Sequence, residues 1–442
     1  MSAFRHPGGR VGPVNDRTMS PLDTRVPALL LRLDRNPFHH GSLGAVRSLG
    51  RAGVEVHAFV EGARSPLARS RYLRCAHEFT GDPHTTGDIE RALSRAAARI
   101  GRPAVLIPMD DLGALAAHRL TPRLRGAYLL PRAPAEPLER AADKAELAEL
   151  CRELGLTHPP TAVPDSAAEA VAALGRLGPP VVAKWSRPWL LPPGGALRST
   201  TVVSGAEQVR RLFACAPRTG SRLLLQRLVP GGAGADWFFH GCFAADGTLL
   251  AGGTGRKDLA WPPGAGLTAV GSRVPNAEVE RAARRLAAGL GYHGVLDADF
   301  RWDAAARAYH LLDVNPRPGA QFRLFTERSG LDVVRALHLD LTCRAVPAVP
   351  AGAAPGRVFV AENYGLPAAL AAGRRWRRAG REVEWAWFAA DDPAPFLAMA
   401  GAWPRRGPLR PRRGRRHASG GRRPAGGGRL SAATAGGARR TA

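Results

Sequence analysis

Residues 295–315 constrain the fold of this chain more than any other segment. Two runs with the pattern of β-strands enclose a short turn, and a Pro-Arg-Pro-Gly sequence follows the second run. Successive side chains of a strand point to opposite faces of a sheet. The segment therefore predicts a hairpin centred near Ala306.

The predicted hairpin brings acidic and amide side chains face to face. Asp299 would lie opposite Asp313, and Asp297 would lie opposite Asn315. Two carboxylates ~5 Å apart repel by about 3 kcal/mol at an effective dielectric constant of about 20, and like charges across a ladder are destabilising. A solvated acidic face is the alternative, but the apolar neighbours of Asp313 indicate partial burial. We therefore expect the hairpin to bind a cation.

The donor atoms at this hairpin favour a hard cation. Asp299, Asp313 and Asn315 offer three oxygen ligands, which suit Mg²⁺ because that ion shares its shell with water and substrate phosphates. Mn²⁺ is the alternative ion. No cluster of histidine and cysteine accompanies the segment to favour zinc.

Lysine is rare in this chain, which has 63 basic residues of which three are lysines and 60 are arginines. Lys144, Lys184 and Lys257 are therefore candidates for positions that need a compact ammonium group rather than a planar guanidinium. The alternative is that three lysines remain by chance. Their sequence contexts argue against it.

Asp299, followed 14 residues later by Asp313-Val-Asn315-Pro-Arg317, resembles the metal-binding signature of the ATP-grasp ligases. In that family, an acid at the end of one strand precedes an acid-x-Asn motif that is often followed by Pro-Arg. Asp313 departs from the pattern, because Glu is usual there. The resemblance implies that ATP and Mg²⁺ are the cofactors and that Asp299, Asp313 and Asn315 are the metal ligands.

The resemblance extends to the lysines and to the charged residues near them. Lys144 and Lys184 are similar to the two phosphate-binding lysines of the family. Gly255-Arg256-Lys257 resembles the basic segment that faces the transferred phosphoryl group. Arg317, Arg256 and Lys257 are therefore the implied catalytic residues, which stabilise charge on the phosphoryl group and the acyl phosphate.

The resemblance also implies where the nucleoside binds. The sequence from Gln226 to Val229 resembles the strand whose backbone meets the adenine edge, where Glu often replaces Gln226. Gln226, Arg227 and Val229 are the implied nucleotide-binding residues of this strand, and Asp236 is the candidate for the ribose hydroxyls.

The expected fold class is α/β and α+β, with a small N-terminal α/β domain of the pre-ATP-grasp type followed by a two-lobed ATP-grasp fold. Its elements are strands at 27–33, 54–60, 104–108, 181–184, 222–229, 237–243 and 248–254 and helices at 42–51, 136–154, 204–215 and 276–290. The expected parts are a disordered N-terminus (1–25), the small domain (26–130), the ATP-grasp domain (131–346), a C-terminal extension packed on the core (347–400) and a disordered basic tail (401–442). The first β-α turn lacks a GxGxxG pattern, which weakens a dinucleotide-binding interpretation.

Composition limits the expected partners. The net charge is +26, and the tail alone carries twelve arginines and no acidic residue. The remaining charge is spread without aromatic clusters, so nucleic acid is an unlikely partner except weakly through the tail. Five widely spaced cysteines without a CxxC pair indicate reduced thiols, and long apolar stretches are absent. A cytoplasmic protein without membrane contact is expected.

The implied function is an ATP- and Mg²⁺-dependent ligation. A carboxylate is activated as an acyl phosphate and joined to an amine through a C–N bond, with amino acids or small peptides as the small-molecule substrates. Three alternatives remain open: an ATP-grasp phosphotransferase, a catalytically silent ATP-binding or regulatory protein, and a nucleic-acid-binding module that uses the tail. The sequence leaves the oligomeric state undetermined.

Overall fold

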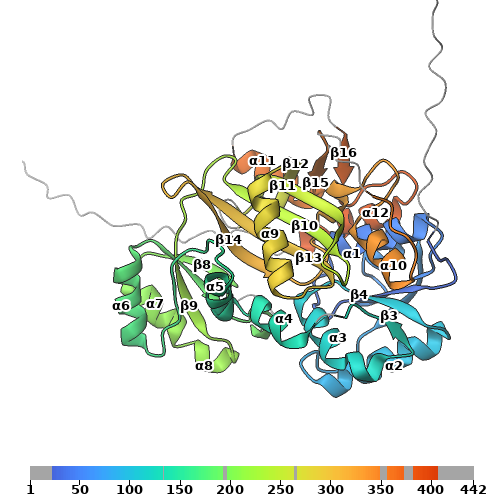
Figure 1. The fold of residues 1–442 in the computed structure, drawn as a ribbon, viewed down its shortest axis with the longest axis horizontal. Helices are drawn as coiled ribbons and strands as arrows, with labels where there is room; N and C mark the ends of the chain where they lie inside the picture. Colours follow the sequence, from blue (N-terminus) through green and yellow to red (C-terminus); the bar gives the residue numbers. More distant parts are fainter. Residues whose placement is uncertain are drawn as a thin grey trace, which may run out of the picture. The chain divides into compact units, whose positions relative to one another are not determined.

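The computed structural model describes residues 22–132, 134–192, 197–262, 266–348, 356–372 and 382–406. In this part of the chain, helices flank three β-sheets, as Figure 1 shows. The architecture is thus a mixed α/β arrangement, as the sequence predicts.

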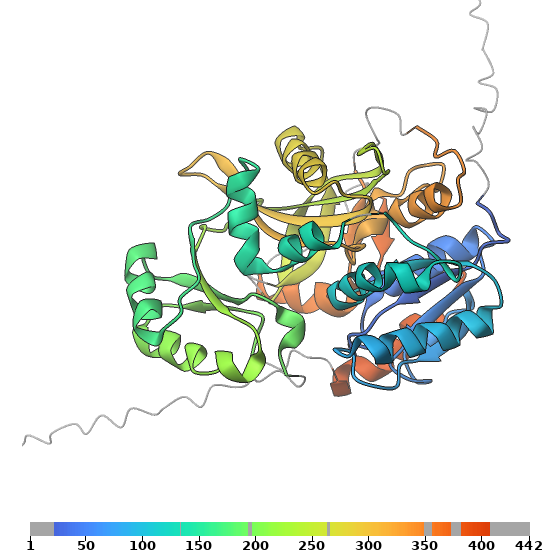
Figure 2. The same ribbon diagram turned by 60° about the horizontal axis from the view of Figure 1, so that its bottom comes forward.

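The N-terminal sheet is parallel throughout, with the strand order β3-β2-β1-β4-β5. Parallel strands need long crossover connections, which helices provide here. Helices α2 and α3 cover one face of the sheet and bury a common apolar core with it (Figure 2). The elements are β1 (Ala28–Leu31), α1 (His40–Arg51), β2 (Val56–Val60), β3 (Leu73–Glu78), α2 (Thr86–Ile100), β4 (Ala104–Pro108), α3 (Asp111–Leu124) and β5 (Tyr128–Leu129).

A four-stranded sheet follows, with the order β6-β9-β7-β8 and antiparallel pairing. Small and branched apolar residues of α6 and α7 pack on its central strands. The elements are β6 (Thr161–Ala162), α6 (Ala167–Leu177), β7 (Val181–Trp185), β8 (Thr200–Val203), α7 (Ala206–Phe213), α8 (Ala216–Thr219) and β9 (Leu223–Arg227).

The largest sheet has seven strands in the order β14-β13-β10-β11-β12-β15-β16. Helices α4, α5 and α9 contribute leucines and alanines to a core that they share with β10, β13 and β14 (Figure 1). The elements are α4 (Ala135–Ala142), α5 (Lys144–Glu153), β10 (Asp236–Phe243), β11 (Leu249–Trp261), β12 (Leu267–Arg273), α9 (Ala277–Gly289), β13 (Gly294–Asp303), β14 (Ala308–Asn315) and α10 (Val333–Leu341).

The C-terminal segment extends the large sheet and also contacts helix α1. Its elements are β15 (Val358–Val360), α11 (Glu362–Ala371), β16 (Val383–Trp385) and α12 (Ala394–Arg406). Arg47 on α1 donates a hydrogen bond from Nε to Asp392 Oδ2 at 2.9 Å, and both side chains are buried. Three short 3₁₀ helices complete the described elements: η1 (Leu67–Arg69), η2 (Pro188–Leu190) and η3 (Phe322–Phe325).

The helix predicted at 136–154 is broken in the structure. Asp143 has extended dihedral angles, and its side chain accepts a hydrogen bond from Ala145 N at 2.9 Å, which starts the new helix α5. The backbone N–H of Lys144 donates to Ser186 O at 2.9 Å instead of continuing α4. The prediction of one helix was therefore wrong, because a tertiary hydrogen bond interrupts a continuous apolar pattern.

The predicted boundaries of the terminal tails are also inaccurate. Leu22 and Asp23 are buried, and helix α12 continues past Gly401 to Arg406. The aromatic ring of Trp403 packs edge-on against Phe38, with centroids 4.8 Å apart, which explains why the order extends beyond the predicted boundary. The predicted disorder of residues 1–21 and 407–442 lies outside the described residues.

Among the described helices, none has both the length and the apolar character needed to cross a membrane.

Candidate nucleotide and metal site

The predicted hairpin is confirmed. Strands β13 and β14 pair antiparallel, with Asp299 opposite Asp313 and Asp297 opposite Asn315. An irregularity of the ladder follows Asp299, where the pairing shifts by one residue. Two carboxylates thus face each other across the pair of strands, which is unfavourable unless positive charge compensates for it.

That positive charge comes from the three lysines, which three different elements supply. Lys144, at the start of α5, donates a hydrogen bond from Nζ to the Asp313 carboxylate. Lys184, on β7, donates from Nζ to the Leu312 carbonyl oxygen at 2.9 Å. Lys257, on β11, places Nζ 3.8 Å from Asp299 Oδ1. All three lysines of the chain therefore end at the acidic hairpin.

Burial and charge set the protonation states at this cluster. Burial would raise the pKa of Asp313, but the ammonium groups of Lys144 and Lys184 outweigh it and hold that pKa below its ordinary value. Burial lowers the pKa of Lys184 to about 8, although the Asp313 charge opposes the shift. Near pH 7 the carboxylate is therefore ionised and the Lys184 amine is still largely protonated.

Asp297 lies beside this cluster, in a more deeply buried position. Burial, together with the nearby charge of Asp299, raises its pKa well above the ordinary value. Asn315 Nδ2 donates to Asp297 Oδ2 at 3.2 Å, so the amide oxygen of Asn315 remains to serve as a cation ligand. Asp297 therefore orients a predicted ligand, a role that its position in the sequence does not reveal.

Arg317 connects the hairpin to helix α3. Its Nη1 lies 3.4 Å from Asp297 Oδ2, and its Nε donates to Asp111 Oδ1 at 3.1 Å. Asp111 lies in the first turn of α3, directly after the buried strand β4. The Met-Asp-Asp sequence at the end of that strand was visible in the sequence, but nothing there indicated its partner.

Gly319 follows the Pro-Arg-Pro sequence and allows the chain to pass close to Asp297. A methyl group on Gly319 would lie 2.8 Å from Asp297 Cγ and would overlap the ring of His240 at 1.8 Å. Only glycine fits at a position where the backbone passes this close to buried side chains. The turn after β14 is therefore closely fitted to the site.

Arg301, which was not among the predicted site residues, joins two of the predicted nucleoside contacts, Val229 and Asp236. Arg301, on β13, donates from Nε to Asp236 Oδ1 at 2.6 Å and from Nη1 to Val229 O at 3.3 Å. Gln226 is buried and donates to Thr161 Oγ1 at 3.0 Å.

The remaining basic candidates have partners other than Asp299 and Asp313. Arg227 Nη2 donates to Asp303 Oδ2 at 3.1 Å. Arg256 Nε donates to Asp258 Oδ1 at 3.0 Å. Because neighbouring residues of a strand point to opposite faces, Arg256 and Lys257 do not share a face of β11. The structure thus brings Lys257, but not Arg256, to the acidic pair.

Comparison with known proteins gives structural matches. No protein-family model matches the chain, and no curated protein sequence matches it. One solved structure with a similar fold is the biotin carboxylase domain of the 2-oxoglutarate carboxylase from Hydrogenobacter thermophilus in complex with MgADP and bicarbonate. The TM-score is 0.57 at 15% identity, over 75% of this chain and 73% of that chain.

Two further solved structures agree with this match. A biotin carboxylase from Campylobacter jejuni gives a TM-score of 0.55 at 13% identity, over 75% of this chain and 74% of its own. An N5-carboxyaminoimidazole synthetase from Staphylococcus aureus gives 0.55 at 10% identity, over 75% and 80%. The chain has the ATP-grasp fold. At these identities the similarity extends to the fold alone, and the chemistry depends on the chain's own residues.

Proposed function

We propose that this chain is an ATP- and Mg²⁺-dependent ligase that joins a carboxylate to an amine. One observation carries the proposal: the three lysines of an arginine-rich chain converge on a pair of opposed carboxylates, Asp299 and Asp313. Such a cluster combines the groups that a magnesium–nucleotide complex requires, namely oxygen ligands for the metal and ammonium groups for the phosphates.

The residues present fit magnesium. Asp299 and Asp313 offer carboxylate oxygens, and Asn315 offers an amide oxygen because its nitrogen is bonded to Asp297. Asp313 remains ionised, because nearby lysines hold its pKa below the ordinary value. Bound there, Mg²⁺ would neutralise negative charge on the phosphates and hold them in position for transfer.

The same residues fit the phosphates of ATP. Lys144 now pairs with Asp313 of the hairpin carboxylates, and Lys184 donates to the Leu312 carbonyl oxygen while its charge also acts on Asp313. With a metal ion at those carboxylates, both ammonium groups would turn to the phosphate oxygens, which a flexible lysine stem allows. We further propose that Gln226, Arg227 and Val229 contact the adenine. Asp236 would reach the ribose by exchanging its bond with Arg301 for bonds to the hydroxyls.

In the proposed reaction, the substrate carboxylate attacks the γ-phosphorus of ATP and ADP leaves, which gives an acyl phosphate. The amine then attacks the acyl carbon, phosphate leaves, and the amine loses a proton. Lys257 and Arg317 would stabilise the charge on the phosphoryl group. Arg256 can take part if it leaves Asp258. Positioning and charge neutralisation supply most of the rate in such a reaction.

The N-terminal parallel sheet supports a pre-ATP-grasp assignment for residues 26–130, with the ATP-grasp domain at 131–346 and the extension at 347–400. Asp111 belongs to this small domain and contacts Arg317 next to the proposed metal ligands. We propose that the small domain forms part of the substrate site. Amino acids or small peptides are the proposed substrates.

The proposal is tested by an ADP-release screen over paired carboxylates and amines, with mass spectrometry of the products. A ligase releases ADP in proportion to an amide product, and it does so only when both substrates are present. A phosphorylated product formed without an amine would identify a phosphotransferase instead. Tight ATP binding without ADP release over the whole panel would indicate a catalytically silent protein.

A further inference from the structure

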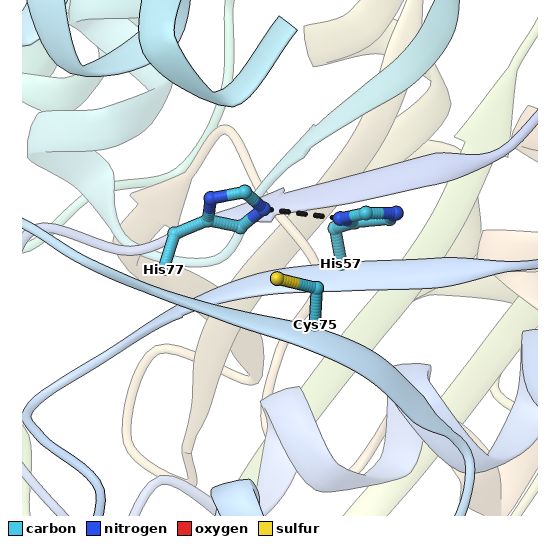
Figure 3. Close-up of side chains that lie close together, drawn as sticks. All are labelled: His57, Cys75 and His77. Atoms are coloured by element: carbon cyan, nitrogen blue, oxygen red, sulfur yellow. Dashed lines mark hydrogen bonds between the residues drawn. The ribbon is translucent and has the colours of Figure 1, made fainter. Parts of the chain in front are cut away.

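Two histidines and a cysteine gather at the edge of the N-terminal sheet. His57 lies on β2, and Cys75 and His77 lie on the edge strand β3 (Figure 3). One potential ligand atom from each residue lies within 4.8 Å of the other two. His57 and Cys75 are register partners across the two strands, and His77 is two residues further along, on the same face. The topology therefore produces a cluster that the wide sequence spacing conceals.

The donor atoms are close enough to share one ion. His57 Nδ1 and His77 Nε2 are 3.0 Å apart. In a tetrahedral zinc site, with Zn–N distances of about 2.0–2.1 Å, two ligand nitrogens lie roughly 3.3 Å apart. A small displacement of either ring would therefore reach ligand geometry. Two imidazole nitrogens and a thiolate sulfur are ligands that Zn²⁺ prefers, whereas Mg²⁺ prefers oxygen ligands.

A carboxylate already orients the buried histidine. Glu55 Oε1 lies 2.9 Å from His57 Nε2, and Glu55 Oε2 accepts a hydrogen bond from Arg102 Nη2 at 3.0 Å. An ionised carboxylate accepts a hydrogen bond from Nε2–H of His57, and in that tautomer the lone pair on Nδ1 is directed toward His77. Carboxylates hold metal-binding histidines in this way, and they fix the tautomer.

The state of His77 also suits a ligand. Burial, together with the nearby charges of His57 and Arg99, lowers its pKa to about 4. The ring is therefore neutral at pH 7. With His57 in the tautomer that Glu55 favours, Nε2–H of His77 donates to Nδ1 of His57 in the absence of a metal. On metal binding, that proton would move to Nδ1 of His77, and Cys75 would release its thiol proton to solvent.

We propose that His57, Cys75 and His77 form a three-ligand Zn²⁺ site in the N-terminal domain, with a fourth position for water or an exogenous ligand. Three protein ligands and one exchangeable position are the arrangement of zinc sites that act on a bound molecule, whereas structural sites have four protein ligands. The site would also fasten the edge strand β3 to β2. It is separate from the acidic hairpin and does not depend on the ligase proposal.

The proposal is tested by cobalt titration of the full reduced chain, in the presence of excess Mg²⁺. One Co²⁺ is expected to bind with a thiolate-to-cobalt charge-transfer band and the visible bands of tetrahedral coordination, and Zn²⁺ is expected to displace it. Cys75→Ser should remove the charge-transfer band, and His77→Gln should weaken binding at least tenfold. Glu55→Gln should weaken binding about tenfold, because second-shell carboxylates contribute 10–100-fold to affinity.

The chain offers matched controls. Cys343→Ser removes an exposed thiol and His84→Gln removes an exposed imidazole, and both should leave the cobalt spectrum unchanged. Asp313→Ala should also leave it unchanged, which separates this site from the proposed magnesium site. Circular dichroism verifies that each variant is folded. Absence of a charge-transfer band in the wild-type chain, or its persistence in Cys75→Ser, would overturn the proposal.

Discussion

At the scale of single residues, the scarcity of lysine carries the most information. An ammonium group is compact and donates in several directions, whereas a guanidinium is planar. In a chain with 60 arginines, Lys144, Lys184 and Lys257 all reach the acidic hairpin. Their common destination was predictable from scarcity and sequence context.

Lys184→Arg should weaken nucleotide binding although the charge is kept. Lys184 is only 8% exposed, so the larger guanidinium has little room beside Leu312. We expect an affinity loss of about tenfold, or roughly 1.4 kcal/mol, measured by calorimetry with a non-hydrolysable ATP analogue. Arg95→Lys, at an exposed position on α2, is the control and should bind normally. Equal affinities for Lys184→Arg and the wild type would refute the phosphate role.

The depressed pKa of Lys184 also predicts a pH dependence of binding. Burial lowers it to about 8 in the free protein, and a bound phosphate raises it by favouring the charged form. Binding therefore takes up a proton at about pH 8, and the affinity should fall as the pH rises from 7 to 9. Calorimetry in buffers of different ionisation enthalpy detects this uptake. A constant affinity over that range would contradict the prediction.

Other residue partners could not be predicted, because folding brings together distant parts of the chain. Arg317 and Asp111 are 206 residues apart in the sequence. The predicted pattern identified Arg317 as a candidate, but no periodicity or motif links it to Asp111. The same limit applies to Arg301, which joins Val229 to Asp236.

At the scale of elements, the hairpin was predictable and the break between α4 and α5 was not. Strand alternation fixes which side chains of 295–315 share a face, so the pairing of Asp299 with Asp313 followed from the pattern, whereas the one-residue irregularity after Asp299 did not. Around Asp143 the apolar pattern runs through without interruption, and the break depends on the bond from Lys144 N to Ser186 O. This break places Lys144 at a helix start, beside the hairpin.

Asp143→Ala should therefore affect both stability and nucleotide binding. The buried carboxylate caps α5 and also accepts a hydrogen bond from Arg187 Nε at 2.8 Å. We expect a loss of about 1–2 kcal/mol of unfolding free energy, measured by urea denaturation, together with weaker ATP binding as Lys144 shifts.

Asn276→Ala is the matched control for that variant. Asn276 caps α9 with two hydrogen bonds, to Glu278 N and Val279 N. Its loss should cost about 1 kcal/mol of unfolding free energy and leave the ATP affinity unchanged. If both variants bound ATP like the wild type, the break at Asp143 would have no role in the site.

At the scale of the whole molecule, the C-terminal segment joins parts that are distant in sequence. It adds two strands to the large sheet and contacts Arg47 of helix α1 through Asp392. The arginine-rich composition predicts a tail that begins at residue 401, but helix α12 continues to Arg406. Aromatic packing of Trp403 is a tertiary effect that composition does not report.

Asp392→Ala should destabilise the protein by about 3–5 kcal/mol, since it leaves the buried guanidinium of Arg47 without its counter-ion. Urea denaturation provides the measurement. The neighbouring pair of Arg51 and Asp391 is partly exposed, so Asp391→Ala should cost about 1 kcal/mol or less. If the two variants lost similar amounts of unfolding free energy, the buried pair of Arg47 and Asp392 would not be the main link between the C-terminal segment and α1.

The central claim is that the acidic hairpin holds a magnesium ion with its nucleotide. Calorimetry of a non-hydrolysable ATP analogue, with and without Mg²⁺, tests it on the wild type, Asp299→Ala and Asp313→Ala. Asp313→Ala also leaves the ammonium group of Lys144 without its counter-ion, so circular dichroism has to verify that both variants stay folded. We predict that Mg²⁺ strengthens binding to the wild type and that each substitution abolishes this gain. Equal Mg²⁺-dependent binding in all three proteins would contradict the claim.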